Sequence, residues 1–530
     1  METPTSRLHV AGVVVLDPAP GETCPSGPPG PSGSPGRSSS PGPSSHPGPS
    51  SSPGPSSSPG PSSHVGEADL ATRQFDAIRA VVGERVGRVP RLLRQAVRAP
   101  LDLQRPVWVD APGLDLDAHI RRATATAPGG RHELEELVGD VLSRQLPLDR
   151  PLWEMVVADG LARGRTGVVA RLHHAILDGV SGATAMAAFL DLAPDETGAG
   201  APKAGSAASV DPTEDVGVPS ALAMWKYAAS SLARQSDAAA ALLERSADAL
   251  IALSRQNRDL ANRGLAPPPA PFSAPRTSLN GSATRERRYA CFSVPLSDLE
   301  LVRSVLGADE ETAQGGRGAT LNDVILAAVG GALRSYLTYR SELPARSLVA
   351  LVPVSTRGHA SVPAERRAHV GNYVSGMLVP LGSTIDDAAA RLRAVARASR
   401  VAKQQESLAG GELLETLLQA VPPVIVSSLM RAVGRLSLFD RLSPPANVVV
   451  SSVVVPDVSL WWAGRPVSAI YPAGPVTDGV GLNITSMTYK STVHFGVVGC
   501  PRLVPDVDEV AVLLDDAVAE LVAAAVDASP

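Results

Sequence analysis

Two adjacent histidines are the residues of this chain whose types and spacing most plainly suggest chemistry. His173 and His174 follow an apolar run and precede Asp178 and Gly179 in the stretch RLHHAILDGVSG, residues 171–182, of a chain with only 10 His in 530 residues. Histidine titrates near neutral pH and can take a proton from a hydroxyl group. The spacing leaves three interpretations open, namely a metal site, a structural histidine pair, and a general base held in place by its neighbours.

The surrounding sequence indicates which elements position the pair. The segment GVVARL before His173 is β-rich and predicts a buried strand, so the histidines lie where a strand gives way to a loop closed by Asp178 and Gly179. Neighbouring side chains on a strand point to opposite faces, and the sequence shows no third and fourth ligand. We therefore favour a general base and expect no metal, with Asp178 orienting the loop or the ring.

Composition limits the class of protein to which this chain can belong. A chain of 530 residues is too long for one hydrophobic core, and 44% hydrophobic with 19% charged residues is typical of a globular protein. The net charge of −5 provides no positive electrostatic field that would attract nucleic acid. Cys24, Cys291 and Cys500 have no metal-ligand spacing, and neither a secretory signal nor an apolar run of spanning length is found. We expect a cytoplasmic protein that can lie on a membrane without crossing it.

Alternating strand and helix patterns predict an α/β protein in two halves. We expect an N-terminal domain over residues 1–265 and a C-terminal domain over residues 266–530. Residues 24–63 are a Pro/Ser/Gly insertion in which SSPGPS repeats, and this composition predicts disorder. Residues 195–265 are expected to form a linker and a connecting helix.

Arginines recur every three or four residues after this insertion. Arg85, Arg88, Arg91, Arg94 and Arg98 lie beside apolar residues and predict the basic face of an amphipathic helix. We favour a solvated face, and the alternative is a face resting on anionic lipid.

Several separated motifs resemble one family. HHxxxDG is the signature of acyl-CoA-dependent acyltransferases related to chloramphenicol acetyltransferase and to peptide-synthetase condensation domains. The stretches QLPLDRPLWE (145–154), TLNDVILAAVGGALRSYL from Thr320, LVPVSTRG, HVGNYVSGMLVPL and GLNIT occur in the order found in the bacterial wax ester synthase/diacylglycerol acyltransferase family. The resemblance runs from about Ser6 to Val510, apart from the insertion.

The resemblance implies two chloramphenicol-acetyltransferase-like domains with a tunnel between them. It implies that His174 deprotonates the hydroxyl of a diacylglycerol or long-chain alcohol, which attacks the thioester of a fatty acyl-CoA, so that acyl-CoA is a co-substrate and no cofactor is required. Peripheral contact with a membrane or lipid-droplet surface follows from the lipid acceptor. Further residues match family motifs near the site: Pro151, Leu152 and Trp153; Asn322 and Asp323; Gly371 and Asn372.

Simpler interpretations stand beside these matches. Trp153 suits packing, and Thr320 with Asp323 forms the pattern of a helix capping box, which is compatible with a position near the site. The chain reads Ser451, Ser452 and then Val453 to Pro456 where the family has a Ser-Asn-Val-Pro-Gly-Pro loop. Two alternative functions remain, a catalytically weak lipid-binding relative and a condensation-type acyltransferase that uses carrier-protein thioesters.

Overall fold

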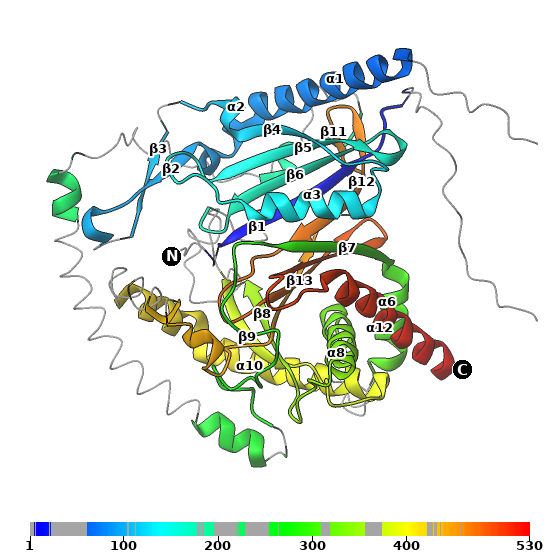
Figure 1. Ribbon diagram of the computed structural model, residues 1–530. Helices are drawn as coiled ribbons and strands as arrows, with labels where there is room; N and C mark the ends of the chain where they lie inside the picture. Colours follow the sequence, from blue (N-terminus) through cyan, green and yellow to red (C-terminus); the bar gives the residue numbers. More distant parts are fainter. Residues whose placement is uncertain are drawn as a thin grey trace, which may run out of the picture.

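The computed structural model describes most of the chain outside the Pro/Ser/Gly segment and the linker (Figure 1). The described residues are 5, 7–20, 22, 61–102, 105–111, 113–176, 182, 185–194, 220, 222–227, 254–262, 264, 266–308, 318–355, 374–420, 428, 432–434, 436–455 and 457–529. The predicted insertion therefore lies almost wholly outside them, and its last residues, 61–63, belong to helix α1 (Pro61–Arg85).

Six strands form the N-terminal sheet in the described chain, in the order β11-β12-β1-β6-β5-β4. Their bounds are β11 Trp461–Trp462, β12 Arg465–Ala473, β1 His9–Leu16, β6 Arg165–His173, β5 Trp153–Leu161 and β4 Ile120–Thr124. Runs of valine such as Val13–Val15 in β1 explain why these segments are extended, since β-branched side chains pack well on a pleated surface. The segment predicted before His173 is β6.

The second sheet has six strands in the described chain, in the order β7-β14-β13-β10-β8-β9. Its strands are β7 Arg288–Pro295, β14 Thr492–Gly499, β13 Leu482–Tyr489, β10 Val448–Val454, β8 Val349–Ser355 and β9 Val374–Pro380. Helices α6 (Leu296–Leu306), α8 (Leu321–Tyr339), α10 (Ala388–Ala420) and α12 (Val507–Ala528) cover it in the lower half of Figure 1. The prediction of an α/β protein is confirmed.

The strands are shared between the two halves of the sequence. β12 comes from the C-terminal half but pairs antiparallel with β1, with Tyr471 opposite Val13. The two sheets cross closely at this point, because a Cβ atom at Gly496 of β14 would lie only 1.7 Å from the carbonyl oxygen of Pro472. The predicted boundary at residue 265 assigns residues 461–473 to the C-terminal domain, whereas in the structure they join the N-terminal sheet.

A helix that packs on the N-terminal sheet also contacts the second sheet. α3 (Arg131–Ser143) packs against the edge strand β7, where Glu135 Oε1 accepts a 2.8 Å hydrogen bond from the amide of Cys291. Burial raises the pKa of the Glu135 carboxyl, although the bond from the Cys291 amide opposes the shift. The main hydrophobic core runs continuously from α3 through both sheets to α12, and a second core lies between the N-terminal sheet and α1.

The arginine-rich segment is not one helix, so that prediction is wrong. α1 ends at Arg85, and the chain continues through two short 3-10 turns, η1 (Val86–Arg88) and η2 (Pro90–Leu93), into β2 (Arg94–Val97). Pro90 lacks the amide hydrogen that a continuing helix would need. Arg85 is buried and forms a 2.7 Å ion pair with Asp191, so it presents no charge to solvent.

The remaining short elements complete the N-terminal part. β2 pairs with β3 (Val107–Asp110) as a two-stranded ribbon that extends from the sheet at the left of Figure 1. The other short elements of this part are η3 Pro100–Asp102, α2 Leu116–His119 and η4 Ala162–Gly164, and η5 Leu438–Asp440 lies in the C-terminal half. In the described part of the chain, no helix combines the length and apolar character that crossing a bilayer requires.

Candidate active site

His173 is the last residue of β6, a central strand of the N-terminal sheet, and both neighbouring strands hold it. It lies opposite His9 of β1, and its amide donates a 2.9 Å hydrogen bond to the carbonyl oxygen of Leu152, the residue directly before β5. The His173 ring is buried and meets the His9 ring edge-on at 5.9 Å between centroids. The first histidine is therefore a packed part of the strand end.

The His173 side chain also shapes the turn that follows. Its Nδ1 accepts a 3.0 Å hydrogen bond from the amide of Ala175, and its carbonyl oxygen accepts a 2.9 Å bond from the amide of Ile176. An Nδ1 atom that accepts this bond carries no proton, so the neutral ring has its proton on Nε2. Nδ1 of His173 is thus already engaged by the backbone and is poorly placed to serve a substrate.

His174 lies one residue beyond the strand, in the turn. Its amide donates a 2.6 Å hydrogen bond to the carbonyl oxygen of Leu8, which precedes β1, and its side chain is half-buried. The backbone of the second histidine is therefore clamped while its ring retains access to solvent. A ring in this position can exchange a proton with a substrate, which a fully buried ring cannot do as readily.

The Pro151-Leu152-Trp153 motif lies directly beside the histidines. Trp153 pairs with Leu172 across β5 and β6, and its Nε1 donates a 2.8 Å hydrogen bond to the carbonyl oxygen of Leu92. Its ring is buried and stacks on the ring of His119 at 4.4 Å between centroids. Burial lowers the pKa of His119, although a hydrogen bond to the Trp153 carbonyl opposes the shift. Packing, the simpler interpretation of Trp153, agrees with these contacts.

A buried ion cluster that the sequence analysis missed lies behind the same strands. Glu154 of β5 pairs with Arg171 of β6 and with Arg121 of β4. Burial alone would raise the pKa of Glu154, but the two guanidinium groups outweigh it and hold that pKa below its usual range. The sequence could have indicated this cluster, because Arg171 stands within the apolar strand segment GVVARL and a buried arginine needs an anionic partner.

Asn322 and Asp323 occupy the first turn of α8. The Asp323 carboxylate is buried and accepts hydrogen bonds from the Thr320 amide at 2.8 Å and the Thr320 hydroxyl at 2.7 Å, which is the predicted capping box. Neither residue contacts His173 or His174 in any interaction that the described residues show. Their expected position near the site stays a prediction.

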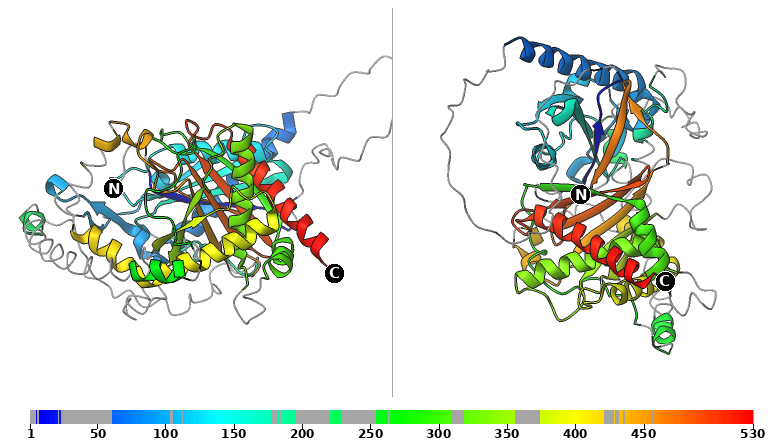
Figure 2. Two further views of the ribbon diagram at one scale, coloured as in Figure 1. Left: turned by 90° about the horizontal axis from the view of Figure 1, so that it is seen from below. Right: turned by 90° about the vertical axis from the view of Figure 1, so that its right-hand side faces the viewer.

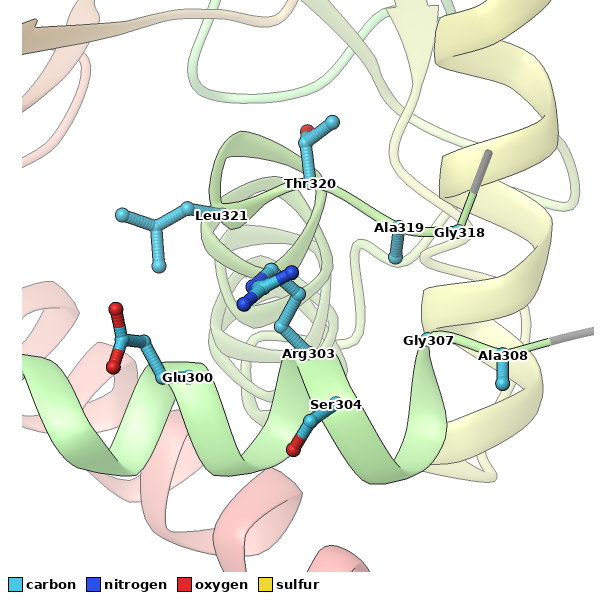
Figure 3. Close-up of a pocket in the computed structure, with 9 residues that line it drawn as sticks. All are labelled: Glu300, Arg303, Ser304, Gly307, Ala308, Gly318, Ala319, Thr320 and Leu321. Atoms are coloured by element: carbon cyan, nitrogen blue, oxygen red, sulfur yellow. The ribbon is translucent and has the colours of Figure 1, made fainter. Parts of the chain in front are cut away.

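A hollow of about 740 Å³ lies beside this helix start, between the end of α6 and the residues leading into α8 (Figure 3). Arg303, Glu300, Thr320 and Leu321 line it, and no residue of the histidine motif does. Residues 309–317, which follow the lining residue Ala308 in the chain, lie outside the described residues, so no function is assigned to this hollow.

The departure from the family loop begins in regular structure, since Ser451 to Val454 belong to β10. β10 continues through Val454, parallel to β13, and the Ser451 and Thr485 hydroxyl oxygens lie 2.9 Å apart across the two strands. Ser452 and Ser486 pair in the same way at 2.6 Å. Valines in place of the family's Pro-Gly residues explain why an extended strand persists at this point.

Four predicted site residues lie outside the described residues, namely Asp178, Gly179, Gly371 and Asn372. The described structure thus brings together His173, His174, Leu152 and Trp153. No group of three or more His, Cys, Asp or Glu side chains within the described ranges could hold a metal ion.

Solved structures identify the fold class of this protein. The wax ester synthase/diacylglycerol acyltransferase from Marinobacter aquaeolei VT8 superposes with a TM-score of 0.61 at 21% identity, covering 99% of this chain and 96% of that one. The first condensation domain of the calcium-dependent antibiotic synthetase superposes with a TM-score of 0.51 at 17% identity, covering 99% and 93%. The chain therefore has the two-domain α/β fold of these proteins.

Sequence comparison narrows the class to one family. Two Mycobacterium tuberculosis proteins, each provisionally named a diacylglycerol O-acyltransferase, are 31% identical over 446 residues (83% of this chain, 81% of the relative) and 34% identical over 458 residues (84% and 87%). The profile described as the wax ester synthase/diacylglycerol acyltransferase catalytic domain matches residues 58–313, and that of the family's C-terminal domain matches residues 370–522. The chain belongs to the wax ester synthase/diacylglycerol acyltransferase family and is an acyltransferase that forms oxygen esters.

Proposed function

We propose that this enzyme transfers the fatty acyl group of an acyl-CoA to the hydroxyl of a diacylglycerol, and of a long-chain alcohol as a second acceptor, with His174 as general base. The observation that carries the proposal is the clamped turn at the end of β6. The His174 amide is held by Leu8, its ring is half-buried, and the neighbouring His173 ring is engaged by the Ala175 amide.

The chemistry needs one base and no covalent acyl-enzyme. His174 takes the acceptor's hydroxyl proton as the oxygen attacks the thioester carbon, and a tetrahedral intermediate forms. The C–S bond then breaks, and the departing CoA thiolate receives the proton from the histidine. We propose that a tunnel between the two domains brings acyl-CoA and acceptor to His174 from opposite sides, because a site closed to water prevents hydrolysis of the thioester.

Diacylglycerol is proposed as the first acceptor because the mycobacterial relatives carry that activity in their names. The long-chain alcohol is added because the Marinobacter protein of the same fold is named for both activities, wax ester synthesis and diacylglycerol acylation. Both acceptors are insoluble in water, so we also propose that the protein works at a membrane or lipid-droplet surface. Fractionation of lipid-loaded cells tests this, and release of the bound fraction by high salt or mild detergent is the expected result.

The activity is tested with purified protein, palmitoyl-CoA, and either dioleoylglycerol or hexadecanol in detergent micelles. The palmitoyl group carries a label, so that release of the free CoA thiol and formation of the labelled ester are both measured. Ester formation that depends on the acceptor supports the proposal. CoA release without any ester would identify a thioesterase, and binding of both lipids without turnover would favour the catalytically weak relative.

A further inference from the structure

The two-stranded ribbon of β2 and β3 stands apart from the two six-stranded sheets of the described chain. We propose that this ribbon, with its tip at Leu101, is the surface by which the protein docks on a bilayer containing anionic phospholipid. The inference rests on the proposed lipid acceptor for its purpose, but its evidence is separate. The ribbon belongs to neither six-stranded sheet, and it projects away from the body in Figure 1 and in the left view of Figure 2.

The tip presents an apolar side chain that the fold does not explain. Leu101 is 73% exposed, the second highest exposure among the large hydrophobic residues described, and its φ is +54°. A branched side chain rarely adopts the left-handed region, where glycine or asparagine is usual, and it gains no burial here in return. A conformation kept at some cost on a projecting tip points to a contact made outside the chain.

Arginines flank this tip. Arg98, Asp102 and Arg105 give it an excess of one positive charge, and Arg88 and Arg91 add two more at the base of the ribbon, within a chain whose net charge is −5. Arg98 and Arg105 flank the tip and are exposed, while Arg94 pairs with Asp110 at 2.9 Å and stiffens the ribbon. Guanidinium groups bind phosphate oxygens with paired hydrogen bonds, and an apolar side chain between them suits the boundary between headgroups and acyl chains.

The base of the ribbon contacts the candidate active site. Arg91, in the turn before β2, donates a 3.4 Å hydrogen bond to the carbonyl oxygen of Ile176, two residues after His174. Leu92 and Ile176 are both buried in the second core, and the Leu92 carbonyl oxygen accepts the bond from Trp153. Docking through the ribbon therefore places the turn that carries His174 close to the lipid surface from which an acceptor would come.

The inference is tested by binding of the full-length protein to sedimentable vesicles of phosphatidylcholine with and without phosphatidylglycerol, across a range of salt. The wild type should prefer the anionic vesicles and dissociate as salt rises. Because one arginine near such a surface contributes about fivefold in affinity, Arg98→Glu with Arg105→Glu should weaken binding at least about 25-fold. Leu101→Glu should weaken it about tenfold or more, since it removes an apolar side chain from the membrane.

Matched control variants exclude a general effect of charge or exposure. Val512→Glu changes an exposed apolar residue of α12, and Arg73→Glu with Arg397→Glu changes two exposed arginines elsewhere by the same total charge. These controls should bind as the wild type does. Equal binding by ribbon variants and wild type, equal losses in the controls, or equal binding of the wild type to neutral and anionic vesicles would each overturn the inference.

A second measurement locates the contact. Leu101→Cys in a Cys24→Ser background is labelled with an environment-sensitive fluorophore, because Cys291 and Cys500 are buried. Its emission should shift to the blue on anionic vesicles, and an unchanged spectrum on bound protein would place the contact elsewhere. Ester formation in micelles is measured in parallel: a ribbon-dependent membrane binder without acyl transfer would refute the proposed function alone, and an active enzyme that ignores vesicles would refute the docking surface alone.

Discussion

The amide of His174 donates a 2.6 Å hydrogen bond to the carbonyl oxygen of Leu8, which lies 166 positions earlier in the chain. The segment before β1 therefore holds the turn that carries the proposed base. Leu152 holds His173 in the same way from the other side, at 2.9 Å. The position of the base therefore depends on backbone contacts from the residues that directly precede β1 and β5, whereas the His173 ring itself accepts a hydrogen bond from the turn.

His174→Ala should lower the rate of acyl transfer by roughly 10²–10⁴-fold, the usual contribution of a general base. The clamp on the backbone of this residue does not involve its side chain, so the thermal midpoint should change little. Turnover is measured by ester formation from palmitoyl-CoA, and binding of acyl-CoA by calorimetry. Turnover close to that of the wild type in a folded variant would show that another group accepts the proton.

His173 should respond differently to two replacements. In His173→Ala the Ala175 amide loses its acceptor inside the protein, which should cost about 0.5–1.5 kcal/mol of unfolding free energy, because Ala175 is exposed and water can take the place of Nδ1. An asparagine oxygen can occupy the place of Nδ1, so His173→Asn should recover part of that loss together with activity. Denaturant unfolding of both variants makes the comparison. Identical behaviour of the two would mean that ring packing on His9, and not the hydrogen bond, is what His173 contributes.

Asp323 separates a capping role from a role at the active site. Because its carboxylate accepts bonds from the Thr320 amide and hydroxyl, Asp323→Ala should lower the stability by about 1 kcal/mol, as Thr320→Ala should. If capping is the whole role, both variants should retain turnover at temperatures well below their midpoints. A large loss of turnover in Asp323→Ala alone would instead indicate that this carboxyl also serves the site.

His494 of β14 should make stability depend on pH. It is buried between Ser293, whose hydroxyl lies 2.7 Å from Nδ1, and the rings of Tyr471 and Tyr489. Burial lowers its pKa from 6.5 to about 4. The unfolded chain therefore binds the proton more readily between these values, so this contribution to stability is present above about pH 6.5 and is lost as the pH falls toward 4.

The loss should approach roughly 3 kcal/mol from this residue, since one pKa unit corresponds to about 1.4 kcal/mol. Denaturant unfolding between pH 4 and 7 is compared for the wild type, His494→Asn and His132→Asn, which changes an exposed histidine of α3. His494→Asn should flatten the dependence, although the buried His119 adds a slope of the same sign in all three proteins. A dependence unchanged by His494→Asn would disprove the assignment.

Deletion of residues 24–60 should leave both the thermal midpoint and acyl transfer unchanged. Apart from Cys24, Arg37 and His46, this segment consists of Pro, Ser and Gly, a composition that offers no side chains for a core. The deletion stops before Pro61, where α1 begins, and keeps Leu8 and β1, which hold the histidine turn. A marked drop in the midpoint would show that the segment packs on the fold.

The sequence by itself determined the local features of this protein. A β-rich run predicted strand β6, and Thr320 with Asp323 predicted the start of α8, because propensity and capping depend on neighbours in the chain. The HHxxxDG spacing and the motifs around it indicated the family, since these residues stand in a fixed order that can be read without a structure. All of this information lies within short windows.

Only the tertiary structure decided which distant segments meet. An alternating strand pattern gives the buried face of β12 but not its partner, and it is the packing of apolar faces in both sheets that places β12 beside β1. The same holds for polar partners. Arg85 belongs by spacing to a basic helix face, yet its ion pair with Asp191 buries it, because the cost of burying a guanidinium is offset only by a carboxylate that the fold brings within 2.7 Å. The clamp on His174 by Leu8 is of this kind, since no pattern within either segment encodes a hydrogen bond between them.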